Sequence, residues 1–242
     1  SSTFFFNSTF FFNSMKPSEA SLSFVFLSLL TISQSILNSD SRTSKHSKVD
    51  ISLREGKVAG RIEEASEIFG EVFHSIPYAQ TPDHELRFEL PRPIQPWNGT
   101  LDSSKSAHCY QFSHPGQEAT HTTMDCLHVK IVVPLDENRR RYKERLPVLM
   151  WIHGGSYQYL GKSLYNTSGI LTAFSSRKVI FVSVAYRLGI FGFLSLLHQD
   201  LPGNFALHDL TTAIKFIHSN ADSIGADPKR ISIAGESAGA AA

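Results

Sequence analysis

The feature that most constrains this chain lies near its C-terminal end, where a short β-branched run meets a small-residue motif around a serine. Ile231–Ala234 predicts a buried strand, and Gly235-Glu236-Ser237-Ala238-Gly239 follows it directly in the form Gly-x-Ser-x-Gly. Small flanking residues are needed where a strand turns sharply into a helix, because a larger Cβ would clash in the turn. The motif alone often arises by chance, but the strand before it favours a nucleophile elbow that holds the Ser237 Oγ clear of the sheet.

A serine in such a turn needs a histidine base and an acid, and in this kind of fold both follow the serine in the chain. The chain ends at Ala242. We therefore expect a fold truncated after the elbow and a fragment without activity of its own. Glu236 is expected to point away from the serine, and three upstream histidines suit only an unrelated fold, so these are interpreted as structural or surface residues: His198, His208 and His218.

Length and charge limit the class of protein. A chain of 242 residues with 41% hydrophobic content can bury one sizeable core. A formal charge of +1 with 19% charged residues gives no large field of one sign, which argues against nucleic acid as a partner. One basic cluster, residues 139–145, is predicted to be a solvated loop. We expect no cofactor, and no metal, because no His, Cys and carboxylate cluster has ligand spacing.

The N-terminal region is unusual. Residues 2–7 are repeated without change as residues 8–13, and Met15 is the first methionine. We interpret residues 1–14 as translated sequence upstream of the true start; a functional aromatic repeat is the weaker alternative. Residues 15–35 resemble a secretory leader, with Lys16, an apolar run from Leu22 to Ile32 and small residues at Ser33 and Ser35. That run is about half of what a bilayer requires, so we expect a secreted or lumenal protein without a membrane anchor.

Residues 36–48 are then predicted to be a polar linker, and residues 49–242 a globular domain. An oxidising destination suits the two cysteines, Cys109 and Cys126, which have only each other to pair with. Closing that loop would stabilise the fold by about 3 kcal/mol. Asn98 and Asn166 each begin an Asn-x-Ser/Thr pattern in a polar turn segment and are predicted to be glycosylated.

Hydrophobic periodicity predicts an α/β sheet with right-handed crossovers after an antiparallel lead-in. Residues 77–97 are too rich in proline for regular elements. The strand at 148–152 is nearly all apolar and is expected to be buried on both faces. The predicted strands are 49–54, 58–63, 68–76, 129–133, 148–152, 179–184 and 231–234, and the predicted helices are 164–174 and 205–220.

His153-Gly154-Gly155-Ser156-Tyr157 comes directly after the predicted strand 148–152. Paired glycines let backbone N–H groups point at a substrate oxygen, as an oxyanion hole requires. Alone, the motif would indicate only a tight turn. Its position upstream of the serine motif favours the oxyanion hole.

With these motifs in place, the chain resembles the type-B carboxylesterase/lipase family, the cholinesterase-like branch of the α/β-hydrolases. The similarity runs from about Val49 to the end. Besides the two glycine motifs, it is carried by these stretches: Ile76-Pro77-Tyr78-Ala79, Leu86-Arg87-Phe88, Asp125-Cys126-Leu127, Ala185-Tyr186-Arg187-Leu188-Gly189, Phe191-Gly192-Phe193-Leu194, Pro202-Gly203-Asn204 and Asp227-Pro228. The resemblance implies the N-terminal half of an α/β-hydrolase fold, with antiparallel strands first and then a mostly parallel sheet flanked by helices.

The resemblance also implies roles. Ser237 matches the acylated nucleophile, and the oxyanion N–H donors fall at Gly155, Ser156 and Ala238. Cys109–Cys126 matches the family's first disulfide, and Arg187 with Asp209 matches a buried ion pair. The implied substrates are small or medium carboxylic esters.

Several residues depart from the family's pattern. Ser156 replaces a commoner glycine, Met124 a usual glutamate, and Ala206 and Leu210 the usual Gly and Gln. The Cys109–Cys126 loop contains no Trp with which to bind quaternary ammonium by cation–π attraction, which argues against cholinesterase activity. The alternatives are a non-catalytic adhesion protein on the same scaffold, which the intact serine motif disfavours, and an unrelated flavodoxin-like binding protein. The sequence does not predict the oligomeric state.

Overall fold

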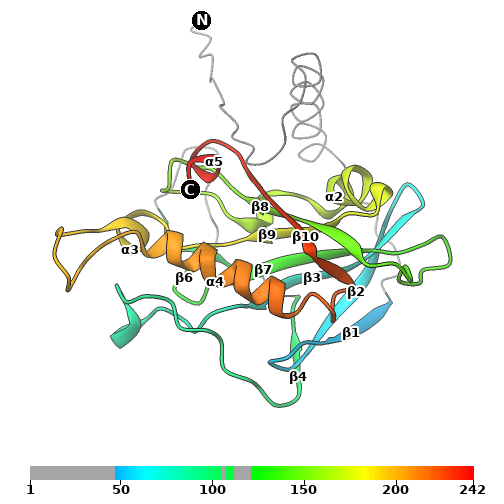
Figure 1. Cartoon of the computed structure of the whole chain (residues 1–242), viewed down its shortest axis with the longest axis horizontal. Coiled ribbons are helices and arrows are strands. Elements are labelled where there is room, and N and C mark those ends of the chain that lie inside the picture. The colour runs from blue at the N-terminus through cyan, green and yellow to red at the C-terminus, as the bar shows by residue number, and fades with distance from the viewer. Residues whose placement is uncertain (1–46, 105–106, 112–120) are drawn as a thin grey trace, which may run out of the picture.

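The computed structural model describes residues 47–104, 107–111 and 121–242, which form a mixed sheet with helices on both faces (Figure 1). The predicted repeat, the leader and nearly all of the linker lie outside the described residues. The eight-stranded sheet has the order β1-β2-β3-β7-β9-β8-β10, with β4 beside β2. Its strands are β1 Lys48–Ser52, β2 Lys57–Ala65, β3 Ile68–Pro77, β4 Thr100–Asp102, β7 His128–Pro134, β8 Leu146–Ile152, β9 Ile180–Val184 and β10 Ala226–Gly235.

The strand directions confirm the predicted change from antiparallel to parallel pairing. β1, β2, β3 and β7 pair antiparallel in succession, and β7 is antiparallel to β9. β9, β8 and β10 are mutually parallel. A two-stranded sheet of β5 His108–Cys109 and β6 Thr122–Thr123 lies apart. The helices are α2 Thr167–Ala173, α3 Gly189–Phe193, α4 Phe205–Ser219 and α5 Ala238–Ala241, with 3₁₀ turns η1 His84–Leu86, η2 Lys162–Leu164 and η3 Ser175–Arg177.

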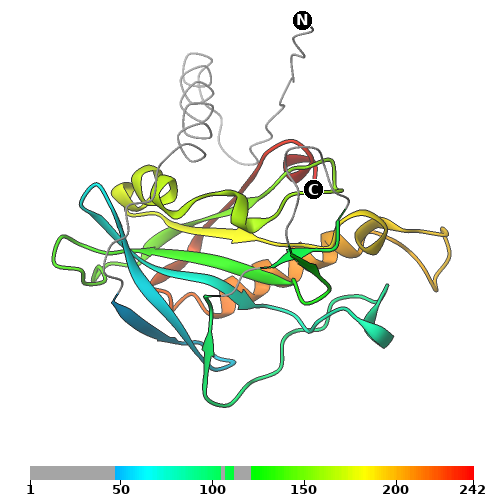
Figure 2. The ribbon, with the colours of Figure 1, turned by 180° about the vertical axis from the view of Figure 1, so that it is seen from behind.

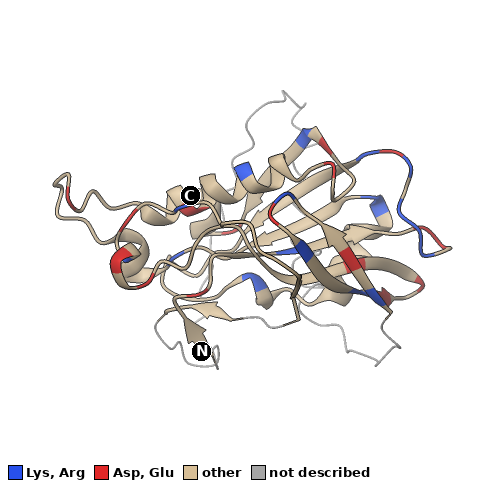
Figure 3. Cartoon of the chain, turned by 90° about the horizontal axis from the view of Figure 1, so that it is seen from below, with Lys and Arg blue, Asp and Glu red and all other residues tan. Residues whose placement is uncertain are grey.

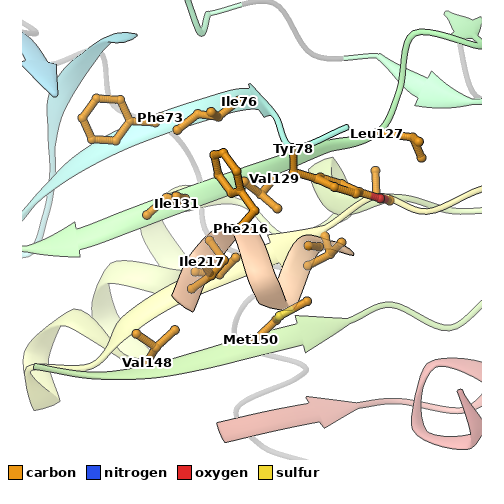
Figure 4. Close-up of a cluster of buried hydrophobic side chains, with 14 of the residues drawn as sticks. Phe73, Ile76, Tyr78, Leu127, Val129, Ile131, Val148, Met150, Phe216 and Ile217 are labelled. Atoms are coloured by element: carbon orange, nitrogen blue, oxygen red, sulfur yellow. The ribbon is translucent and has the colours of Figure 1, made fainter. Parts of the chain in front are cut away.

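Helices cover both faces of the sheet, as Figures 1 and 2 show from opposite sides. α4 lies on one face, where Phe216 and Ile217 pack on a core that includes Ile131 and Met150 (Figure 4). α2 lies on the other, where Ile170 and Leu171 join a second cluster of buried side chains that includes Val72, Val132 and Phe181. The sheet is therefore a buried layer between two helical ones. Among the described residues, no helix is long and apolar enough to span a membrane.

Three sequence-based expectations about these elements were wrong in detail. In β8 buried residues alternate with partly exposed ones such as Trp151, so only one face is fully buried. β10 is longer than predicted and is an edge strand with Ile233 49% exposed, because no strand described here pairs with its outer side. The helix predicted at 164–174 begins only at Thr167, since the Asn166 Oδ1 accepts a hydrogen bond from the Gly169 N–H at 2.7 Å and caps it.

The basic segment 139–145 forms part of the loop between β7 and β8, as expected, and three of its arginines form ion pairs. Arg141 pairs with Glu71, and Arg139 Nη2 lies 3.4 Å from Glu64 Oε2. Arg145 pairs with Asp222. Figure 3 shows acidic and basic residues interspersed along the ribbon. These three ion pairs hold the loop against neighbouring elements.

Two predicted tertiary links are present. Cys109 and Cys126 form a disulfide with Cα atoms 5.0 Å apart. Arg187, just past β9, forms a two-pronged ion pair with Asp209 of α4, with Nε–Oδ2 and Nη2–Oδ1 distances of 2.8 and 2.7 Å. Both side chains are almost fully buried, at 2% and 0% exposure.

We expect Asp209→Ala to lower the free energy of unfolding by about 3–5 kcal/mol, because it leaves the Arg187 charge buried without a partner. Urea unfolding followed by tryptophan fluorescence measures this loss. Asp222→Ala, which removes the partner of Arg145 on the surface, is the matched control and should change stability by no measurable amount. Equal losses in the two variants would contradict a special role for the buried pair.

Candidate active site

The Gly-x-Ser-x-Gly motif forms a tight turn between β10 and α5. β10 ends at Gly235 and α5 begins at Ala238, so Ser237 is the residue at the bend. Its backbone has φ 54° and ψ −124°, a conformation that a serine rarely adopts and that tertiary packing must hold. A Cβ on Gly235 would lie 2.3 Å from the Gly239 carbonyl oxygen, and one on Gly239 would lie 2.2 Å from that of Ile152. The two glycines are therefore required by close backbone approach, as the sequence predicted.

The glycine motif after β8 packs directly against this turn. β8 and β10 are parallel neighbours with Ile152 in register with Gly235, so the two loops leave the sheet side by side. A Cβ built on Gly154 would lie 2.7 Å from the Glu236 carbonyl oxygen and 3.0 Å from the Ser237 Cβ. Only a glycine at this position lets the two segments meet. The structure thus brings together the regions in which the sequence placed the nucleophile and two of the donors.

The glycine loop forms a tight turn that is closed by hydrogen bonds to the carbonyl group of Gly155. That oxygen accepts hydrogen bonds from the N–H groups of Gln158 and Tyr159 at 2.8 and 3.1 Å. Gly155 has φ 98°, and Ser156 and Tyr157 follow with φ 52° and 61°. Three successive left-handed residues are strained, and such strain concentrates where a backbone is held for a function. Ser156 carries this strain where the family's commoner glycine would carry less.

His153 packs against the glycine loop, a structural role that the sequence did not predict. Its ring is buried and stacks on Tyr186 with centroids 4.6 Å apart, and its Nδ1 lies 2.9 Å from the Gly154 carbonyl oxygen. The Tyr186 hydroxyl donates to the His153 carbonyl at 2.7 Å. Burial lowers the pKa of His153 to about 4, so the imidazole is neutral near pH 7. A His before a Gly-Gly pair was visible in the sequence, but its burial was not.

Glu236 is half-buried, and its Oε2 lies 3.1 Å from the position that a Cβ on Gly154 would occupy. Burial raises the pKa of this carboxyl. Its side chain therefore lies against the glycine loop, a placement that the sequence did not predict. The three upstream histidines set aside from the sequence are all exposed: His198, His208 and His218.

A Ser-His-Asp arrangement away from Ser237 joins β3 to β7. The Ser75 Oγ lies 2.8 Å from the His128 Nδ1, and the His128 Nε2 lies 3.2 Å from the Asp125 Oδ1. Ser75 is only 5% exposed, so its hydroxyl does not meet solvent. We interpret the trio as a tie between the bulged strand β3 and the Cys109–Cys126 loop. Among the described residues, no group of three or more His, Cys, Asp and Glu side chains is arranged to hold a metal ion.

The two sequons lie in different settings. Asn98 is in an exposed turn before β4, while Asn166 is half-buried at the N-cap of α2. Their glycosylation stays a prediction.

The buried His153 makes stability depend on pH. Its pKa is about 4 in the folded protein and about 6.5 in the unfolded chain, so only the unfolded chain takes up this proton between those values. The contribution is complete above about pH 6.5 and is lost as the pH falls toward 4. We expect His153→Phe to reduce the loss of stability between pH 7 and pH 5 by roughly 2 kcal/mol, measured by urea unfolding at both pH values. His218→Phe, at an exposed site on α4, should keep the wild-type dependence; the same change in both variants would exclude His153 as its source.

Known proteins resemble this chain over the part that carries these features. The model of the carboxylesterase family matches residues 45–242. Venom carboxylesterase-6 of Apis mellifera is 40% identical over 176 residues, which cover 71% of this chain and 30% of that protein. Juvenile hormone esterase of Tribolium castaneum is 40% identical over 173 residues, covering 69% and 28%. An acetylcholinesterase of Leptinotarsa decemlineata is 38% identical over 192 residues, covering 69% and 30%.

The chain therefore spans about three tenths of the length of these curated relatives. Within that span, the family match includes both the glycine loop after β8 and the serine turn after β10. The resemblance read from the motifs is confirmed, and so is the α/β-hydrolase fold that it implied. The chain belongs to the carboxylesterase family.

Proposed function

We propose that the protein of which these residues form a part is a serine hydrolase of small or medium carboxylic esters. The observation that carries the proposal is the close packing of the glycine loop against Ser237. A Cβ added at Gly154 would lie only 3.0 Å from the Ser237 Cβ. A nucleophile and a set of backbone donors must converge on one carbonyl group for acyl transfer. Membership of the carboxylesterase family supports this reading.

In the proposed reaction, the Ser237 Oγ attacks the carbonyl carbon of the ester while a general base takes its proton. The carbonyl oxygen becomes an oxyanion, which the N–H groups of Gly155, Ser156 and Ala238 stabilise. The tetrahedral intermediate expels the alcohol, which receives the proton, and leaves an acyl-enzyme that water then hydrolyses. The proposal requires the base and its acid from outside the 242 residues, so this chain alone should have no esterase turnover.

We further propose that the protein enters the secretory pathway. The predicted leader at 15–35 and the two sequons support this, and the Cys109–Cys126 disulfide suits an oxidising compartment. The proposed substrate is a small molecule, as membership of the carboxylesterase family implies. A non-catalytic adhesion protein is not favoured, because the strained conformation of Ser237 is retained.

The nucleophile can be tested directly. We expect an organophosphate to label Ser237 in the full-length protein, because the reagent mimics the tetrahedral state and needs the same serine and donors. Mass spectrometry of the tryptic peptide locates the label, and hydrolysis of p-nitrophenyl butyrate measures activity. Ser237→Ala should abolish both, while Ser156→Gly, which keeps the backbone N–H, should retain both. A folded, glycosylated protein that is inert to the reagent would favour the adhesion alternative.

The donors can be tested through the glycine that positions them. A Cβ at Gly155 would lie 2.1 Å from the Tyr159 carbonyl oxygen, so Gly155→Ala must move the loop. Loss of one oxyanion donor typically lowers kcat by about 10²–10³, and we expect a loss of this size. Gly225→Ala is the matched control, because Gly225 also has a positive φ, 72°, but no atom lies within 4 Å of its Cβ position. Equal kcat values in the two variants would place the oxyanion hole elsewhere.

A further inference from the structure

A depression of about 620 Å³ lies between the hairpin that joins β1 to β2 and the segment that leads into β4. Residues 52–57 line it on one side and residues 96–100 on the other, and its volume is in the range of small-molecule sites. In Figures 1 and 2, β1 and β4 lie at the lower side of the molecule, whereas α5, which follows Ser237, lies at the upper side. The depression is therefore remote from the candidate active site, and the proposed reaction does not use it.

The complete Asn98-Gly99-Thr100 sequon is part of this lining. Asn98 and Thr100 are exposed, and no atom beyond the chain neighbours of Gly99 lies within 4 Å of the position that a Cβ there would occupy. An acceptor asparagine must be reached by a transferase, so exposure of the whole motif suits modification. Asn166 is half-buried instead, and its Oδ1 caps α2. Of the two sequons, the one at Asn98 is therefore better placed to carry a glycan.

The indole of Trp97 forms a fixed wall of the depression. Its Nε1–H donates to the Lys57 carbonyl at 3.0 Å, and the backbone N–H of Trp97 donates to the Glu55 carbonyl at 2.8 Å. A Cβ on Gly56 would lie 2.5 Å from the Trp97 Nε1, so the ring packs directly on the hairpin backbone. Asn220, at the C-terminus of α4, holds the hairpin in turn, because its Nδ2 donates to the Glu55 Oε2 at 3.0 Å. The wall is therefore preformed, which lowers the cost of ordering a ligand against it.

The lining combines rings with charged groups, and a sugar needs both. The C–H faces of a pyranose ring are apolar and pack on aromatic rings, while its hydroxyl and acetamido groups need hydrogen-bond partners. Trp97 and Pro96 supply the ring surfaces. The charged residues of the hairpin supply donors and an acceptor beside them: Arg54, Glu55 and Lys57.

We propose that Asn98 carries an N-linked glycan whose first N-acetylglucosamine residues lie in this depression against Trp97. In the attachment step, the Asn98 Nδ2 forms a bond to C1 of the first sugar of a lipid-linked oligosaccharide, the lipid diphosphate leaves, and the amide loses one proton. The inference rests on the proposed entry into the secretory pathway, which supplies that donor, and is independent of the esterase function. A glycan held there covers the end of β1, an outer strand of the described sheet, and so shields it from pairing with other chains.

The test uses the full-length protein secreted from mammalian cells and measures how fast peptide-N-glycosidase F releases the Asn98 glycan from the native protein. The enzyme converts the asparagine to aspartate, so mass spectrometry of the peptide locates and times the release. Ser52→Arg fills the depression from an exposed position on β1 without offering a ring. It should speed release about tenfold, as expected if the glycan is free of the depression only about a tenth of the time in the wild type. Trp97→Leu, which removes the ring, should also speed release.

Asp50→Arg is the matched control, because Asp50 is also an exposed position of β1 but does not line the depression. It should leave the release rate as in the wild type. Urea unfolding checks that each variant keeps its fold, and Ser52→Arg carries the test alone if Trp97→Leu does not fold.

A wild-type release rate in Ser52→Arg, or equal acceleration in Asp50→Arg, would overturn the placement of the glycan in the depression. An Asn98 peptide without a glycan in the secreted protein would overturn the attachment itself. Either result leaves the proposed esterase function intact. A full-length protein that is not secreted would overturn the proposed localisation, and this inference with it.

Discussion

The buried pair of Arg187 and Asp209 is the interaction on which the arrangement of this end of the molecule depends. Burial raises the pKa of the Asp209 carboxyl, and the Arg187 guanidinium opposes that rise. The carboxylate accepts three hydrogen bonds from Arg187, one of them from its backbone N–H at 3.1 Å. The remaining guanidinium nitrogen, Nη1, donates to the Glu89 carbonyl at 2.8 Å. One side chain thus joins the end of β9, helix α4 and the proline-rich segment, three parts far apart in the sequence.

The Arg187–Asp209 pair is connected to the candidate site by the backbone segment that follows Arg187. From Arg187 the chain enters α3, whose first turn is fixed by the close contact of Gly192 with the Arg187 carbonyl and by the Gly189 hydrogen bond to Tyr157. The glycine loop is therefore held by α3 on one side and by the stacked rings of His153 and Tyr186 on the other. A buried ion pair contributes little net stability compared with apolar packing. We interpret its role here as fixing one relative position of the three segments that it joins.

The sequence predicted what local patterns and spacing encode. Period-two and period-3.6 hydrophobicity identified the main strands and α4, and small residues identified both tight loops. What it missed depends on neighbours distant in sequence. Ile231 and Ile233 suggest a buried strand by composition, but exposure depends on which strands lie beside β10. The apolar run in β8 likewise did not reveal that its second face is only partly covered. Nor could a lone histidine after a strand indicate whether it would be a base, a ligand or, as His153 is, a buried support stacked on a tyrosine.

The candidate site was predictable because it is made of backbone. Ser237, Gly155, Ser156 and Tyr157 all have positive φ, and the strain is held by glycines that allow chains to approach within distances that a Cβ would forbid. Requirements of this kind appear in a sequence as glycines at fixed spacing, whatever the surrounding side chains. A donor that is a backbone N–H group tolerates a change of side chain, so in the proposed oxyanion hole Ser156 can stand where a glycine is commoner.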